Sequence, residues 1–265
     1  MVRWLGLFLL LVVCSVSGYQ FLAVQSLSEG MASLLPGVCR PSAIEVVCDG
    51  EKCAHARARV TILGFQAAQV NPRILFLGDS NTEALVVPAR LCEQAVLNAG
   101  VGGANSAFIS AMLPEFLTNA GGQVGMTVLA VGTNDAVTGA ETPVADFAAN
   151  VRRTVDILRR NGSQVLLVTV PPVEQGRPLG DAYFSMQHIG ILNEALRRVA
   201  QEESVTVVEG AARFSSSEGW AIPGSTFDGV HFTSTSHRRW LEEVTHALED
   251  SDFCRRQAIG QGAGD

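Results

Sequence analysis

The sequence predicts a single α/β domain with three layers, in which a parallel sheet of about five strands is covered by helices on both faces. The main observation is that short, β-rich apolar runs alternate with longer segments of helical period. In addition, the chain has 265 residues, of which 47% are hydrophobic, so it can bury one large core. These features exclude a disordered chain, a collagen-like chain and a short disulfide-rich scaffold.

The expected elements follow from this alternation. The apolar runs that predict strands are Ile74–Leu77, Ala95–Asn98, Met126–Val131, Gln164–Val170 and Val205–Val208. The segments that predict helices are Ser106–Leu117, Pro143–Arg160, Asp181–Glu202 and Ser234–Leu248. Within Pro143–Arg160, apolar side chains from Phe147 to Leu158 recur at spacings of three and four, which gives one stripe facing the sheet.

The amino terminus has the sequence pattern of an export signal. Arg3 precedes the apolar run Trp4–Val13, apolar character resumes at Phe21–Val24, and no charged residue occurs between Arg3 and Glu29. Residues 1–25 therefore predict either a cleaved signal peptide or a retained membrane anchor. Because Arg3 stays on the inner side of the membrane in both cases, the rest of the chain is expected outside the cytoplasm, secreted, periplasmic or anchored.

Three further segments complete the expected organisation. Residues 26–70 are expected to form a stalk or lead-in, because Val24 to about Arg59 has no clean periodicity. Residues 71–250 are expected to form the folded domain. Residues 251–265 are expected to form a flexible tail, because Gln257 to Asp265 is glycine-rich and polar. The lead-in holds Cys39, Cys48 and Cys53, and an oxidising compartment favours a disulfide among them. A zinc site of Cys48, Cys53 and His55 is the alternative, but it offers too few ligands.

The net charge of the chain argues against some classes of binding partner. The formal net charge is −7, so there is no broad positive field to attract nucleic acid or anionic lipid. We therefore expect no nucleic-acid partner. The oligomeric state is left open by the sequence.

Three polar and glycine-rich turns directly follow predicted strands, where ligands bind in open parallel sheets. They are Gly78-Asp79-Ser80-Asn81, Asn98 to Gly103 and Gly132-Thr133-Asn134-Asp135. A fourth turn, Asp228-Gly229-Val230-His231, lies near the C-terminus. Each turn alone is typical of a helix N-cap or an Asx turn. Their joint occurrence at successive strand ends indicates a catalytic site.

This set of turns resembles the SGNH hydrolases, also called the GDSL esterase/lipase family, over about Arg73 to Trp240. The resemblance implies a flavodoxin-like fold, with Ser80 as nucleophile, His231 as general base and Asp228 as the carboxylate that orients it. It also implies an oxyanion hole of the Ser80 N–H, the Gly103 N–H and the Asn134 side-chain amide. Counting from Asn98 in the family pattern selects Gly103 over Gly100.

The chemistry explains these residue types. A serine hydroxyl is a weak nucleophile until an imidazole accepts its proton, and a carboxylate holds that imidazole in the correct tautomer. Two positions depart from the family pattern: Asn81 stands where an aliphatic residue is more common, and Phe232 where proline is common. Neither departure removes a catalytic group.

The function expected from this resemblance is a serine esterase that hydrolyses acyl or acetyl esters through an acyl-enzyme, on a small molecule or on an extracytoplasmic carbohydrate or lipid. Two alternatives stay open: an O-acyltransferase that modifies envelope polysaccharide, and a noncatalytic glycan-binding domain. No cofactor or metal is expected. A dinucleotide site at Gly100-Val101-Gly102-Gly103 fails because Asn105 stands where the fingerprint requires glycine.

Overall fold

The structure, a computed structural model, describes residues 52–120 and 123–261, and these form a sheet flanked by helices. The sheet has six strands in the order β2-β3-β1-β4-β5-β6. The strands are β1 (Ile74–Gly78), β2 (Arg90–Leu91), β3 (Gln94–Gly100), β4 (Met126–Ala130), β5 (Gln164–Val168) and β6 (Thr206–Val208). All pairings are parallel except that of the short β2 with β3. The predicted α/β class is confirmed, and β2 is the additional strand.

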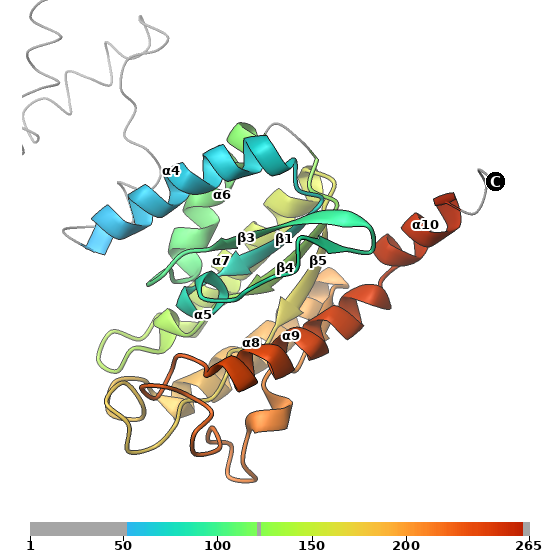
Figure 1. Cartoon of the computed structure of the whole chain (residues 1–265). Coiled ribbons are helices and arrows are strands. Elements are labelled where there is room, and N and C mark those ends of the chain that lie inside the picture. Colours follow the sequence, from blue (N-terminus) through green and yellow to red (C-terminus); the bar gives the residue numbers. More distant parts are fainter. Residues whose placement is uncertain (1–51, 121–122, 262–265) are drawn as a thin grey trace, which may run out of the picture. The chain divides into compact units, whose positions relative to one another are not determined.

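Helices cover both faces of the sheet (Figure 1). In β1, Leu75 and Leu77 point into one core, whereas Ile74 and Phe76 point into the other, as the alternation of side chains along a strand requires. The first core is closed by α4 (Lys52–Val70), α6 (Ser106–Ala120), α7 (Val144–Arg160) and α8 (Met186–Glu203). The second core is closed by α9 (Ser234–Glu249) and α10 (Asp252–Gln261).

Three of the four predicted helices begin within one residue of their expected start, but α8 begins later than expected. Ser185 caps α8, because its side chain accepts a hydrogen bond from the His188 N–H at 3.2 Å. The preceding residues form turns, in which the Tyr183 N–H donates to the Gly180 carbonyl at 3.0 Å. Three short helical segments were not predicted: α5 (Ser80–Glu83), η1 (Asn134–Ala136) and η2 (Ala212–Phe214).

The expectation of a stalk over residues 26–70 is wrong for its second half, because Lys52–Val70 forms helix α4. Leu63 and Ala67 of this helix are fully buried in the first core. The outer face of α4 also carries apolar residues, since Ile62 and Phe65 are 49% and 67% exposed. Apolar side chains on both faces hide the helical period in the sequence.

The expected flexible tail is also wrong for residues 252–261, which form α10. Phe253 is buried in the second core, and Cys254 forms a disulfide with Cys92 across a sequence separation of 162. The disulfide expected among Cys39, Cys48 and Cys53 lies outside the described residues and side chains.

The proposed signal or anchor at residues 1–25 lies outside the described residues as well. Among the helices that the structure does describe, none combines the length and the hydropathy of a membrane span. Within those same residues, no three His, Cys, Asp or Glu side chains gather as metal ligands would.

Candidate active site

The predicted site residues gather at the carboxyl end of the sheet, around β1. From β1 the chain passes to β2 and β3 on one side of this strand, and from β3 it crosses to β4 on the other side. This reversal of strand order is the switch point where open α/β sheets bind ligands. Ser80 is the first residue of α5, and Asp79 caps this helix by accepting from the Asn81 N–H at 3.0 Å. Burial raises the pKa of the Asp79 carboxyl, although hydrogen bonds from Thr133 and Asn81 oppose the shift.

Ser80, His231 and Asp228 form one continuous line of hydrogen bonds. His231 Nε2 lies 2.9 Å from Ser80 Oγ, although the two residues are 151 positions apart. On the other side of the ring, His231 Nδ1 lies 2.7 Å from Asp228 Oδ2. Since a carboxylate only accepts, Nδ1 carries the hydrogen and Nε2 is left as the acceptor for the serine hydroxyl.

The Asp228 carboxylate is itself held in place. Its second oxygen, Oδ1, accepts from the backbone N–H groups of Val230 at 3.1 Å and His231 at 2.9 Å. Burial alone would raise the pKa of this carboxyl, but the hydrogen bonds from His231 and Val230 outweigh it and lower the pKa. The side chains of His231 and Asp228 remain 36% and 31% exposed, so solvent and substrate can reach them.

Glu174 supports the loop that carries Asp228, and sequence reasoning missed it. Its buried carboxylate accepts from the N–H of Gly224 at 3.0 Å, the N–H of Thr226 at 3.1 Å and the Thr226 hydroxyl at 2.7 Å. The Glu174 N–H also donates to the Gly229 carbonyl at 2.8 Å. Burial opposes ionisation, but these donors and Arg177 lower the pKa of Glu174. The available signal was an acidic residue shortly after β5.

The structure separates the two glycines considered for the oxyanion hole. Gly103 is exposed with φ +77, nothing lies within 4 Å of a Cβ built there, and its N–H makes no hydrogen bond within the described residues. The Gly100 N–H is already donated to Asn98 Oδ1 at 2.9 Å, and a Cβ on Gly100 would lie 2.2 Å from the Glu83 nitrogen. Gly103 therefore offers a free donor, whereas Gly100 is a packing position.

Asn134 lies beside this glycine loop. Its Nδ2 donates to the Ala104 carbonyl at 3.0 Å, which fixes the amide and leaves its second hydrogen for a ligand. The neighbouring Asp135 accepts from the N–H and hydroxyl of Ser106 at 2.9 and 2.7 Å. Burial raises the pKa of Asp135, and hydrogen bonds from Ser106 oppose the shift. These contacts connect the loops that carry Gly103 and Asn134.

Helix α4 contacts the glycine loop through an Arg59–Glu83 pair, whose side chains approach to 3.7 Å. Arg59 donates to the carbonyls of Asn98 and Gly100, both at 2.9 Å. The Glu83 carboxylate accepts from the Gly102 N–H. His55, once considered as a zinc ligand, instead lies 3.1 Å from Glu83 Oε2. Arg59 and Glu83 therefore both hold the loop that ends at Gly103, Arg59 through its carbonyl groups and Glu83 through the Gly102 N–H.

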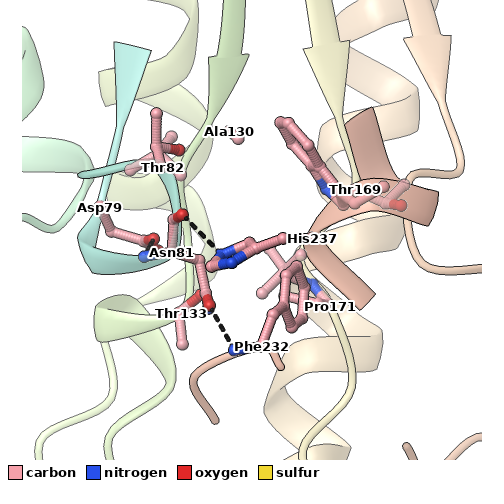
Figure 2. A pocket seen from close by; sticks show the side chains of 12 residues that line it. Asp79, Asn81, Thr82, Ala130, Thr133, Thr169, Pro171, Phe232 and His237 are labelled. Carbon is pink, nitrogen blue, oxygen red and sulfur yellow. Dashed lines mark hydrogen bonds between the residues drawn. The ribbon is translucent and has the colours of Figure 1, made fainter. Parts of the chain in front are cut away.

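A separate small cavity lies beside the nucleophile turn (Figure 2). Asp79, Asn81, Thr133 and His237 are among the residues that line it, and its volume is about 20 Å³. A cavity of this size holds about one water molecule. Neither Ser80 nor His231 lines it, so it is not the place where an ester would meet the nucleophile.

Comparison with known proteins finds one family model and an esterase that match this chain. The model of the GDSL-like lipase/acylhydrolase family matches residues 76–239, a range that contains all five predicted site residues but not α4. The isoamyl acetate-hydrolyzing esterase of Saccharomyces cerevisiae is 24% identical over 164 residues, which cover 58% of this chain and 68% of that esterase.

Solved structures share the fold. A GDSL-like lipase from Bacteroides thetaiotaomicron superposes with a TM-score of 0.60 at 22% identity, covering 74% of this chain and 98% of the lipase. A carbohydrate acetylesterase from Sinorhizobium meliloti superposes with a TM-score of 0.53 at 16% identity, covering 66% of this chain and 97% of that enzyme. At these identities the likeness establishes the fold alone.

Proposed function

The chain belongs to the GDSL-like lipase/acylhydrolase family and is a carboxylic ester hydrolase, and from this premise we propose that it works as a serine esterase through an acyl-enzyme. Ser80 is the nucleophile, His231 the general base and Asp228 the group that orients the imidazole. The observation that carries the proposal is the hydrogen-bonded line from Ser80 Oγ through His231 to Asp228, at 2.9 and 2.7 Å.

In the acylation step, Ser80 Oγ attacks the ester carbonyl carbon while His231 Nε2 accepts the hydroxyl proton. The carbonyl oxygen becomes an oxyanion, which accepts hydrogen bonds from the N–H groups of Ser80 and Gly103 and from Asn134 Nδ2. When the tetrahedral intermediate collapses, the ester C–O bond breaks. The imidazolium returns its proton to the leaving alcohol, and the acyl group stays on Ser80.

In the deacylation step, water takes the place of the alcohol. His231 accepts a proton from the water as its oxygen attacks the acyl carbon, and the same donors bind the second oxyanion. Collapse releases the carboxylic acid, and the proton passes from His231 back to Ser80 Oγ. Asp228 stays ionised throughout, because its pKa is lowered and three donors hold it.

The decisive test is turnover of p-nitrophenyl acetate by the wild type, Ser80→Ala and His231→Ala. The two variants should lose at least about 10³-fold in kcat. Ser217→Ala, at an exposed serine outside the site, is the matched control and should match the wild type. Equal rates for Ser80→Ala and the wild type would refute the proposal, and a fluorophosphonate that fails to label the folded wild type would count against it independently.

We also propose that the natural substrate is an acetyl or acyl ester of a carbohydrate or lipid outside the cytoplasm. The N-terminal sequence of Arg3 followed by an apolar run supports this location, and so does the Cys92–Cys254 disulfide, since disulfides persist in oxidising compartments. The carbohydrate class is suggested by the Sinorhizobium meliloti relative, and short acyl groups by the Saccharomyces cerevisiae relative, whose name specifies an acetate ester.

A substrate panel tests this second proposal. The purified protein is assayed with acetylated polysaccharide, with a lysophospholipid and with p-nitrophenyl esters of increasing acyl length. We expect the highest kcat/KM for acetyl groups, and a preference for long acyl chains would contradict that expectation. Repeating the assay with a deacetylated glycan as acceptor distinguishes hydrolysis from transfer, because transfer yields acetylated glycan and lowers the yield of free acetate.

A further inference from the structure

Asn81, the residue that follows the proposed nucleophile, spans the gap to the loop that carries His231. Its Nδ2 donates to the Val230 carbonyl at 3.1 Å, and its Oδ1 accepts from the Phe232 N–H at 3.0 Å. The Asn81 side chain therefore holds the backbone on both sides of His231. Asn81 is only 8% exposed, so water does not readily replace either hydrogen bond.

The remaining polar groups of Asn81 are also paired (Figure 2). Its N–H donates to Asp79 Oδ1 at 3.0 Å, and its carbonyl lies 3.2 Å from His237 Nε2 of α9. Burial, opposed by the bond to Asn81, lowers the pKa of His237, which favours the neutral ring. With its backbone held by Asp79 and His237, Asn81 presents its side-chain amide to the His231 loop in one orientation.

We propose that Asn81 is a positioning residue, which keeps His231 Nε2 within hydrogen-bond reach of Ser80 Oγ by binding both backbone neighbours of that histidine. The inference rests on the proposed function of Ser80 and His231. It assigns to Asn81 no contact with substrate. Since Asn81 is adjacent to Ser80 in the chain, its two hydrogen bonds fix the base relative to the nucleophile rather than relative to the domain as a whole.

Phe232 completes this arrangement. The residue is 2% exposed, and its ring packs edge-on against the rings of Phe214 and His237, with centroid distances of 4.9 and 5.4 Å. Its N–H is the donor to Asn81, and a proline at this position would have none. The two departures from the family pattern, Asn81 and Phe232, are therefore the two partners of one hydrogen bond.

The test uses Asn81→Leu, which keeps the branched shape of the side chain with larger terminal groups and removes both hydrogen bonds. Displacement of a catalytic group by about 1 Å costs roughly 100-fold, so we expect kcat for p-nitrophenyl acetate to fall roughly 10- to 100-fold. KM should stay within about twofold, and the rate of labelling by a fluorophosphonate should fall with kcat. The smaller variant Asn81→Ser provides the same measurement if the leucine disturbs folding.

The matched control is Asn193→Leu. The Asn193 side chain likewise makes two hydrogen bonds to backbone, donating to the Val170 carbonyl at 2.9 Å and accepting from the Val170 N–H at 2.7 Å. Within the described residues it makes no hydrogen bond to Ser80 or to the His231 loop. A general loss of stability would lower Tm in both variants. Only Asn81→Leu should lower kcat.

The same substitution in the His231→Ala variant distinguishes failure of the positioning role of Asn81 from failure of the proposed function. In His231→Ala the base is absent, so adding Asn81→Leu should leave the residual rate unchanged within about twofold. If Asn81→Leu keeps wild-type kcat, or if it lowers the rate equally in both backgrounds, the positioning role is overturned. Failure of the proposed function would instead show as full activity in His231→Ala.

Discussion

Replacing Arg59 by methionine tests whether α4, which lies outside the family match, contributes to catalysis. The Arg59 side chain is 16% exposed, and its guanidinium donates two hydrogen bonds of 2.9 Å to the carbonyls of Asn98 and Gly100. A charged donor contributes about 1.5–3 kcal/mol per hydrogen bond, so the loss of both bonds should lower the unfolding free energy by at least about 3 kcal/mol. For a domain of this size a loss of about 3 kcal/mol lowers Tm by about 6–12 °C.

The catalytic effect follows from the position of Gly103. One oxyanion donor is worth about 10²–10³ in kcat, and Arg59→Met is expected to displace the N–H of Gly103, the proposed donor, rather than to remove it. We therefore expect kcat for p-nitrophenyl acetate to fall about 10- to 100-fold at a temperature well below Tm, with KM nearly unchanged.

The control for this prediction is Arg159→Met, which breaks a pair with Glu203 at 3.0 Å between side chains that are 40% and 30% exposed. Surface pairs of this kind contribute about 0–1 kcal/mol, so both Tm and kcat should stay close to wild type. A lower Tm for Arg59→Met with kcat equal to that of the control would refute the reasoning and leave α4 a purely structural role.

Three further predictions concern other parts of the molecule. Asp228→Asn should lower kcat about 10³–10⁴-fold in the p-nitrophenyl acetate assay with little change in Tm, because an amide at this position favours the wrong imidazole tautomer; a loss below tenfold would contradict the orienting role. Cys254→Ser should lower the unfolding free energy in urea titrations by up to about 5 kcal/mol, since the Cys92–Cys254 disulfide closes a loop of 162 residues; equal unfolding midpoints for the two proteins would contradict this. The lowered pKa of Glu174 contributes stability that is fully present above its unfolded value of 4.5 and is lost as pH falls through the folded value, so Glu174→Gln should flatten the decline of Tm below about pH 4.5; an unchanged slope would contradict this.

The parts of the fold that sequence reasoning identified are those with one dominant local signal. Strands such as β1 are buried on both faces and read as continuous apolar runs, and α7 has a single apolar stripe, so both were predicted. Helix α4 was missed because Ile62 and Phe65 are exposed on the face opposite Leu63. Helix α10 was missed because the disulfide and the packing of Phe253 tie it to the domain, and neither shows in a local pattern.

The candidate active site shows the same difference between residues with a local sequence signal and residues without one. The residues proposed to react with the ester, Ser80 and His231, follow from their places in recurrent turns, because the chemistry fixes both their types and their order along the chain. Asp228, which orients His231, was found in the same way. The other groups that hold these residues in place were not, because a hydrogen bond such as that of Asn81 to Phe232 joins positions 151 residues apart and leaves no periodic trace. In this protein the structure explains two positions that depart from the family pattern and that the sequence alone left unexplained. Here Asn81 and Phe232 look unrelated in the chain, yet each supplies what the other needs, an acceptor and a donor. A substitution at either position is best judged by its effect on the distance between His231 and Ser80.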